Sequence, residues 1–202
     1  MTFVFGTLAI LIVILLSWNH LFPSQSAPVL ITDPNNLPGI ETGLAPWSPE
    51  IAHLHARLAA IGLPALSAEG SALHIHQHLD LFINGSTTTI PAGIGIDEAG
   101  GFISPIHTHD TSGIIHVESN TVRNFTLGQF FDIWGVRFTK DALGGYLVSA
   151  TGTLQVYANG SLVSGDPRAL VLTPHQEIVV VYGTKADLPK TIPATYSFPA
   201  GD

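Results

Sequence analysis

The sequence contains no cysteine, and its only methionine is Met1. Disulfides, cysteine-ligated zinc, iron–sulfur clusters, c-type haem attachment and thiolate-bound blue copper all require cysteine, so this chain can form none of them. The lack of methionine after residue 1 also disfavours storage of Cu(I), which prefers sulfur ligands. Any metal bound here must therefore use imidazole, carboxylate or water.

Basic residues are also scarce. Lys and Arg together number 7 among 202 residues, charged residues make up 11% of the chain, and the net charge is −8. A nucleic-acid-binding surface needs a stripe of lysine and arginine to meet the phosphate backbone, and the sequence offers none. We therefore expect no nucleic-acid partner. The length suits one well-buried domain with appendages, because single cores usually form from about 100 to 200 residues.

One long segment carries no charged residue at all, from Phe3 to Trp18 (FVFGTLAILIVILLSW). With Leu21 and Phe22 the apolar stretch reaches about 20 residues, which as a helix crosses a hydrocarbon core of ~30 Å. A cleaved signal peptide is the alternative, but the n-region lacks a basic residue and the nearest small-residue site is followed by Pro28. We therefore expect a transmembrane anchor over residues 1–23, with the rest of the chain on the periplasmic or extracellular side.

Composition divides the remaining chain into a connector and a domain. Residues 24–47 are rich in Pro, Asn and Gly without a sustained hydrophobic period, which is typical of an extended tether. Residues 48–202 show the periods of regular structure and form the expected single domain. At its start, Ser48-Pro49-Glu50 supplies a helix N-cap, a proline at the first helical position and an acidic first turn. Gly62 and Pro64 end this helix.

The hydrophobic period changes to two from Leu73 onward. In LHIHQHLDLFING the aliphatic residues point to one face of a strand and the histidines to the other, and Asn84-Gly85 closes a hairpin. We expect a second hairpin at Asn159-Gly160, followed by an apolar strand from Ile178 to Tyr182.

Helical structure is limited in this domain. FTLGQFFDIWG predicts a short helix that offers Phe130, Phe131 and Trp134 to the core, and the proline-containing last twenty residues predict an irregular surface tail. The expected fold class is therefore mainly β (α+β). It comprises an N-terminal transmembrane helix and then a compact β-sandwich or barrel-like domain with one or two short helices.

Histidine is the unusual residue of the first strand, where His74, His76 and His78 occupy alternate positions. Side chains at i and i+2 of a strand lie on one face about 6.5 to 7 Å apart. With metal–nitrogen bonds of ~2.0–2.1 Å, two such imidazoles can bind one ion. The outer pair is separated by about 13 Å of strand, so at most two of the three readily serve the same ion.

A second block, PIHTHDTSGIIHVE, supplies further ligands if its strand lies beside the first. The expected ligand pool is His76, His78, His107, His109 and His116, with His74 as a less favoured member. Three carboxylates, Asp80, Asp110 and Glu118, are better placed to orient an imidazole through its other ring nitrogen. Two alternatives to a metal site stay open: the histidines form the polar face of a sheet, or they form a surface that responds to pH near 6 to 6.5.

Copper and zinc are the ions expected at an imidazole cluster without sulfur. Cu(II) binds such ligands most tightly in the Irving–Williams order, and zinc is the commoner ion in practice. Iron and manganese become candidates when carboxylates join the site.

These blocks also carry a resemblance. HIHQHLDLFINGSTTTIPAGIGI, HTHDTSGIIHVES and FTLGQFFDIWG resemble a group of uncharacterised bacterial proteins, exported or membrane-anchored, over roughly Leu73 to Gly135. The resemblance implies an extracytoplasmic location and no particular activity. The His-x-His with a later histidine is also similar to a cupin, but a cupin adds a glutamate soon after the pair, where this chain has Asp110 and then His116. The LQVYANG and PHQEIVVVYG segments are similar to the end of a small β-grasp domain.

Three functions fit these observations. The first is a membrane-anchored extracytoplasmic domain that binds Cu or Zn through the histidines, for metal handling or as a metallocentre beside a membrane system. The second is a non-catalytic accessory subunit of a larger membrane protein complex. The third is a metalloenzyme, a hydrolase, hydratase or oxidoreductase, because three histidines with an open position let zinc lower the pKa of a bound water to about 7.

Overall fold

The computed structural model describes residues 33–201. These residues form a mainly β domain with two short α-helices, which confirms the expected fold class at that level. The anchor expected over residues 1–23 lies outside the described residues. Within residues 33–201, no helix has both the length and the apolar character needed to cross a membrane.

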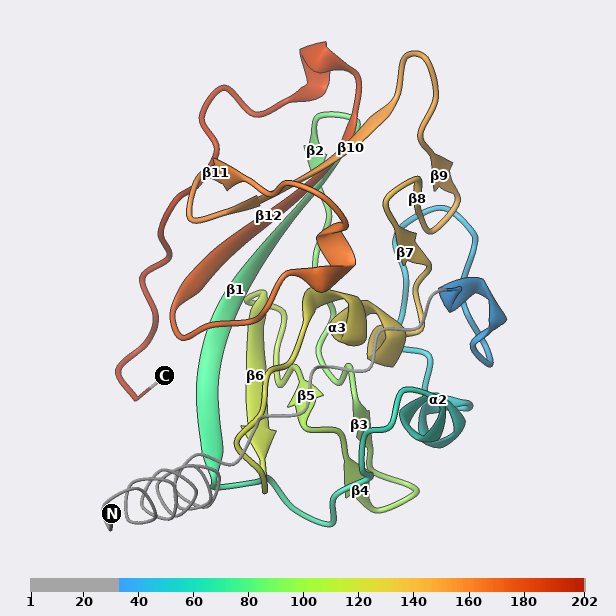
Figure 1. Cartoon of the computed structure of the whole chain (residues 1–202), viewed down its shortest axis with the longest axis vertical. Helices are drawn as coiled ribbons and strands as arrows, with labels where there is room; N and C mark the ends of the chain where they lie inside the picture. Colours follow the sequence, from blue (N-terminus) through green and yellow to red (C-terminus); the bar gives the residue numbers. More distant parts are fainter. Residues whose placement is uncertain (1–32, 202) are drawn as a thin grey trace, which may run out of the picture.

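The main sheet has seven strands in the order β11-β10-β12-β1-β6-β5, with β2 paired to the end of β1 (Figure 1). Its strands are β1 (Leu73–Ile83), β2 (Ser86–Thr87), β5 (Ile106–His107), β6 (Ile114–Ser119), β10 (Thr153–Ala158), β11 (Ser161–Leu162) and β12 (Gln176–Gly183). Strand β12 runs parallel to β1, and the other neighbours are antiparallel. The first and last long strands therefore lie side by side at the centre of the sheet.

The remaining elements are short. Two small sheets comprise β3 (Ile96–Asp97) with β4 (Phe102–Ile103), and β7 (Phe138–Thr139) with β8 (Ala142–Leu143) and β9 (Tyr146–Leu147). The helices are α2 (Leu54–Ala60) and α3 (Leu127–Trp134), and the 3-10 turns are η1 (Pro34–Asn36), η2 (Pro167–Ala169) and η3 (Lys185–Asp187).

Strand β1 has the alternation expected from its sequence. Leu79 and Leu81 are buried in the hydrophobic core. On the neighbouring β6, Ile115 and Val117 point into the same core. Because side chains alternate between faces, the residues between these aliphatic positions lie on the opposite face of the sheet. That opposite face carries the histidines.

Both expected hairpins are confirmed. Asn84 and Gly85 have φ of 50° and 79°, and Asn159 and Gly160 have φ of 49° and 77°. A two-residue turn with two positive φ values matches the right-handed twist of the strands that it joins. Asparagine and glycine adopt this conformation at little steric cost, which explains why the two turns share one sequence.

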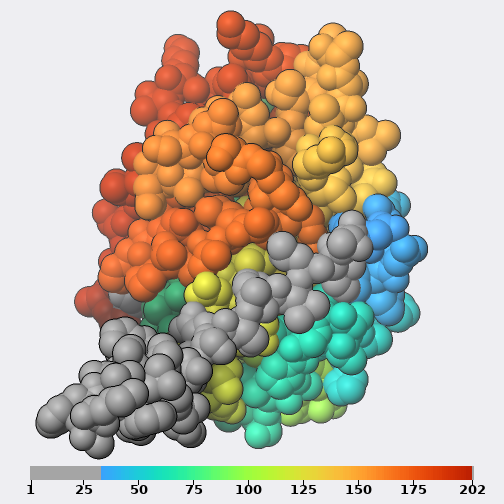
Figure 2. Space-filling view, in the orientation of Figure 1, coloured from blue at the N-terminus to red at the C-terminus, as the bar shows by residue number. Residues whose placement is uncertain are grey.

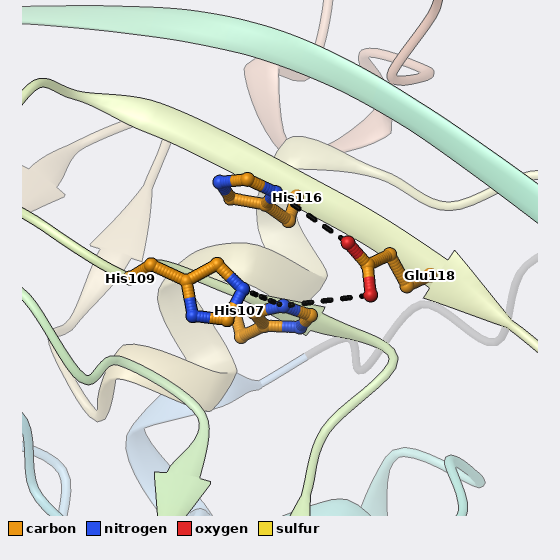
Figure 3. A group of neighbouring side chains, drawn as sticks. All are labelled: His107, His109, His116 and Glu118. Carbon is orange, nitrogen blue, oxygen red and sulfur yellow. Dashed lines mark hydrogen bonds and ion pairs between the residues drawn. The ribbon is translucent and has the colours of Figure 1, made fainter. Parts of the chain in front are cut away.

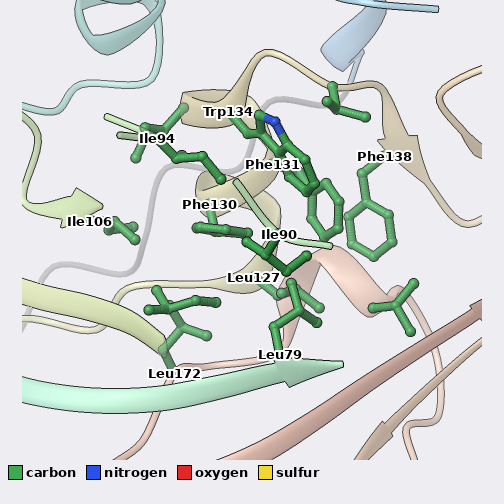
Figure 4. Packing of buried hydrophobic residues seen from close by; sticks show 14 of the residues in the cluster. Leu79, Ile90, Ile94, Ile106, Leu127, Phe130, Phe131, Trp134, Phe138 and Leu172 are labelled. Carbon is green, nitrogen blue, oxygen red and sulfur yellow. The ribbon is translucent and has the colours of Figure 1, made fainter. Parts of the chain in front are cut away.

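Helix α3 is the centre of the core (Figure 4). A capping box begins it, because Thr126 Oγ1 accepts from the Gln129 backbone N–H and the Gln129 side chain accepts from the Thr126 N–H. Gly135, with φ of 84°, ends it in the left-handed conformation. All residues of the helix are buried, including the three aromatic residues expected in the core, Phe130, Phe131 and Trp134.

The described part of the expected tether is packed against the domain. Leu37 and Trp47 belong to the hydrophobic core, and the Trp47 ring meets the Trp134 ring edge to face, with centroids 5.9 Å apart. The Glu41 backbone N–H also donates to Gly135 O at 2.7 Å. Residues 33–47 are therefore part of the domain surface and core, whatever role residues 24–32 have.

Helix α2 begins later than the sequence predicted. Its N-cap is His53, which makes no side-chain capping bond, and the Ser48-Pro49-Glu50 segment is not helical. The physical reason is Arg57, which is fully buried and pairs with both the carboxylate and the backbone carbonyl of Glu50. Arg57 also donates to Ile133 O, near the C-terminus of α3, at 3.1 Å. These bonds hold Glu50 in a non-helical position and override the local capping pattern.

The C-terminal third covers one end of the molecule. Figure 2 shows it in orange and red over the upper part of this face. After η3, the described residues 188–201 contain no helix or strand, as the sequence predicted.

Candidate metal centre

The register of three strands gathers the histidines on one face of the main sheet. His76 of β1, His116 of β6 and His107 of β5 are directly paired and form a row across the strands. Beside this row, His74 of β1 is paired with Glu118 of β6. Directly opposed residues of antiparallel strands share a face, with Cβ atoms about 4.5–5.5 Å apart. Five candidate ligands therefore lie together because of strand pairing alone.

His107, His109, His116 and Glu118 form one group, drawn in Figure 3, which we call the three-histidine site. One ligand atom from each residue lies within 4.8 Å of the others. His107 Nε2 is 3.1 Å from His109 Nε2, and His116 Nδ1 is 3.5 Å from Glu118 Oε1. Ligands of a tetrahedral ion with bonds of ~2.1 Å lie about 3.4 Å apart, so these atoms already have the spacing of a coordination shell.

His107 is the buried floor of this site. Its side chain is fully buried, and its Nδ1 donates to the backbone carbonyl of Ser104 at 3.0 Å. This bond fixes the tautomer, because the carbonyl only accepts, and it leaves the Nε2 lone pair directed at the site. Burial, helped by neighbouring imidazoles, lowers the pKa of His107 to about 3. The ring is therefore neutral near pH 7, which is the form that binds metals.

Glu118 lies among the ligand nitrogens and is a candidate ligand itself. The sequence had suggested an orienting role. Its side chain is only 5% exposed. Burial raises the pKa of Glu118, and the nearby carboxylate of Glu69 raises it further. A bound cation would supply the opposite charge that a carboxylate in this position requires.

The rim of the site is open to solvent. The His109 side chain is 42% exposed, and its Nε2 lies 3.3 Å from Glu69 Oε1. A cleft of about 560 Å³ borders His109 and is also lined by Asp97 and Glu98. A centre with a buried floor and an exposed rim has room for a water molecule or a small ligand in addition to the protein ligands.

His74 and His76 form an adjoining group with Glu118, again with one ligand atom of each within 4.8 Å. The structure thus brings together four of the five histidines in the expected pool and adds His74, the less favoured member.

His78 is the member of the pool that lies apart. Its Nδ1 is 2.8 Å from Glu177 Oε2 and its Nε2 is 3.0 Å from the Ser112 carbonyl oxygen. With an N–H on each nitrogen the ring donates to both acceptors, and it is then a cation paired with a buried carboxylate. Burial lowers the pKa of His78, but the hydrogen bond and charge of Glu177 outweigh this and raise it. The ring also stacks on Tyr196, with centroids 3.7 Å apart and planes at 6°.

The two aspartates expected to orient imidazoles are placed elsewhere. Asp80 lies with His78 and Glu177 in a separate group, in which one ligand atom of each residue is within 4.8 Å of the others. The Asp110 side chain accepts from the Ser112 backbone N–H at 2.8 Å and so shapes the turn between β5 and β6. The residue that does orient an imidazole, Ser104, acts through its backbone carbonyl and gave no signal in the sequence. Glu69 and Glu177 lie far along the chain from the histidines that they contact, so no local pattern marks them.

Comparison of the chain with protein-family models, with curated proteins and with solved structures found no match. The function assigned below therefore rests on the geometry of the site. The resemblance noted over Leu73 to Gly135 stays a prediction.

Proposed function

We propose that this domain binds a transition metal ion, copper or zinc, at the three-histidine site. The observation that carries the proposal is the convergence of three imidazoles and one carboxylate from β5, β6 and the loop between them. The buried His107 is held in its metal-binding tautomer by Ser104, an arrangement that a merely polar sheet face does not need. Its burial as a neutral ring also argues against a cluster that exists only to take up protons.

The donor set favours copper or zinc over other ions. Three imidazoles and a carboxylate suit zinc in a four-coordinate site, and Cu(II) is the tightest divalent binder of nitrogen ligands. Glu118 also admits iron or manganese, which accept mixed imidazole and carboxylate ligands. A bound ion would supply Lewis acidity, while the residues of this chain fix its ligand geometry and limit its access to water.

Metal analysis of protein purified without an affinity tag tests the proposal. We expect at least one ion of Cu or Zn per chain, and loss of the ion held at this site in the variant His107→Ala with His109→Ala. A matched control removes two histidines outside the cluster, His53→Ala with His55→Ala, and should retain all metal. Full retention of metal by the first variant, or no metal in the wild type after equilibration with either ion, would refute the proposal.

A metalloenzyme is the second candidate, favoured by the cleft beside His109. Its volume of about 560 Å³ lies within the range of ~300–1,000 Å³ typical of small-molecule sites. Asp97 and Glu98 on its wall are available as proton acceptors. If the metal keeps an open position, azide should shift the visible spectrum of the Cu(II) or Co(II) protein. An unchanged spectrum at saturating azide indicates a closed site and contradicts the enzyme.

We further propose that residues 1–23 anchor the domain on the periplasmic or extracellular side of a membrane, beside a larger membrane complex. The uncharged apolar segment and the resemblance to exported proteins support this location. Membrane fractionation and protease treatment of intact cells test it. Release of the chain by alkaline carbonate contradicts the anchor, and migration of the detergent-extracted chain alone in a native gel contradicts the complex.

A further inference from the structure

Two histidines beside the three-histidine site form a second set of ligands. His74 Nε2 lies 3.1 Å from His76 Nε2, the same separation as the His107–His109 pair. His74 Nε2 also lies 3.1 Å from Glu118 Oε1. We call His74, His76 and Glu118 the two-histidine site. Its donor atoms have the spacing expected around one ion with bonds of ~2.1 Å.

The six side chains of the two sites do not form one ligand group. Two ligands of a single ion lie at most about 4.2 Å apart when the bonds are ~2.1 Å. The six side chains fall into two sets, each with its atoms within 4.8 Å of one another, and these sets share only Glu118. His74 and His76 on β1 therefore offer ligands to a separate ion.

The carboxylate of Glu118 belongs to both sets. Its Oε1 lies 3.1 Å from His74 Nε2 and 3.5 Å from His116 Nδ1, and its Oε2 lies 4.0 Å from His107 Nε2. Figure 3 shows the two oxygens directed to His116 and to His107 of the three-histidine site. A carboxylate that contacts the ligands of two ions can bridge them, and paired ions in two-metal sites lie about 3.5–4 Å apart.

We infer that the domain holds a dinuclear metal centre, in which Glu118 bridges an ion at the three-histidine site and a second ion bound by His74 and His76. This inference rests on the proposed metal-binding function. The second ion has three protein ligands, so it keeps at least one position for water or a small anion. His74 and His76 line a cleft of about 380 Å³, together with Ile75, Pro174, His175 and Gly201.

The residues of the two-histidine site differ in their exposure to solvent. His76 and Glu118 are 4% exposed each, whereas the His74 side chain is 54% exposed. The His74 side therefore opens to its own cleft, separate from the cleft that borders His109. The two ions share a bridge but exchange ligands through different openings.

Copper titration of the untagged, full-length protein tests the inference. We expect about two Cu(II) ions per chain in the wild type, with an integrated electron paramagnetic resonance signal well below the copper content, because bridged Cu(II) ions couple. His74→Ala with His76→Ala should bind about one ion and give a signal equal to its copper content. The control His53→Ala with His55→Ala should behave as the wild type.

Two further variants keep the test decisive. His74→Ala alone removes an exposed side chain, so it should fold normally and should weaken the second ion by at least about tenfold. Glu118→Gln removes the bridging charge and should abolish the magnetic coupling. One ion in the wild type with no effect of His74→Ala overturns the dinuclear centre but leaves the proposed function in place. Two uncoupled ions, unaffected by Glu118→Gln, overturn the bridge, and no bound ion overturns both proposals.

Discussion

Replacement of His78 by alanine separates the structural histidine from the metal-binding ones. His78 and His76 were equally expected as ligands, but the structure pairs His78 with Glu177, whose side chain is 1% exposed. We expect His78→Ala to lower the free energy of unfolding and to leave the metal content unchanged. The physical reason is that Glu177 stays buried in the variant without its charged partner.

The size of this effect follows from the burial of both groups. Removal of one partner from a buried ion pair costs about 3–5 kcal/mol. The lower end applies here, because burial already raises the pKa of Glu177 and lets the carboxyl group take up a proton in place of its lost partner. Loss of the stack on Tyr196 adds about 0.5–1.5 kcal/mol. A domain of this size then loses roughly 7–18 °C in melting temperature, at ~2–4 °C per kcal/mol.

The stabilisation by His78 has a defined pH dependence. The folded-state pKa of His78 is raised above its usual value of 6.5, because Glu177 outweighs the effect of burial. A raised histidine pKa contributes stability that is complete below about pH 6.5 and is lost as the pH rises through the folded-state pKa. The difference in unfolding free energy between wild type and His78→Ala should therefore be larger at pH 6 than at pH 9.

Urea denaturation at both pH values, together with metal analysis, checks the prediction. His53→Ala is the matched control, because His53 pairs with Glu50 at 2.9 Å with its side chain 54% exposed, and an exposed pair contributes about 0–1 kcal/mol. If His78→Ala loses metal while its stability stays within 1 kcal/mol of wild type, on the scale of an exposed pair, His78 is a ligand and the reasoning from Glu177 is wrong.

Three further predictions concern the scaffold and the site. Thr126→Ala removes the cap of α3 and should cost about 0.5–2 kcal/mol in urea denaturation, with Thr126→Ser close to wild type. Gly113→Ala should destabilise more than Gly165→Ala: both have positive φ (90° and 84°), but a Cβ at Gly113 would lie 2.7 Å from Leu79 O and one at Gly165 meets nothing within 4 Å. Equal losses would contradict the clash. Removal of metal by a chelator should leave the far-ultraviolet circular dichroism unchanged. It should lower the free energy of unfolding by about 4 kcal/mol relative to protein with metal at 1,000 times its Kd. Unfolding of the apoprotein would show that the ligands are not held by the fold.

Local chemistry accounts for the elements that the sequence predicted correctly. Strand β1 runs through the expected segment, with Leu79, Leu81 and Ile83 buried in the core, and both Asn-Gly turns have the positive φ values that their sequence favours. Helix α3 carries its own capping box and C-terminal glycine. Each of these signals lies within a few residues of the structure that it specifies, so tertiary contacts reinforce it and do not override it.

Long-range contacts account for what the sequence did not predict. The predicted start of α2 was wrong because Arg57 pairs with the Glu50 carboxylate and also donates to Ile133 O near the end of α3. No local sequence pattern contains these contacts. The ion pair of His78 with Glu177 joins β1 to β12. These strands are neighbours in the sheet but lie far apart in the sequence. Periodicity shows which face a side chain occupies, but the partner across the sheet depends on the strand order, and this chain places β12 on one side of β1 and β6 on the other.

That strand order also explains how the fold holds the metal ligands. A shift of one residue between β1 and β6 would turn His74 and His76 away from Glu118, because successive side chains alternate between faces. The same shift would expose Leu79 and Leu81, which are each 2% exposed in the core. Burial of a leucine side chain contributes about 1.5–3 kcal/mol, so the aliphatic face of β1 fixes the register that the histidine face requires. The ligand positions are therefore set by folding of the sheet, and a bound ion would add stability to an arrangement that already exists.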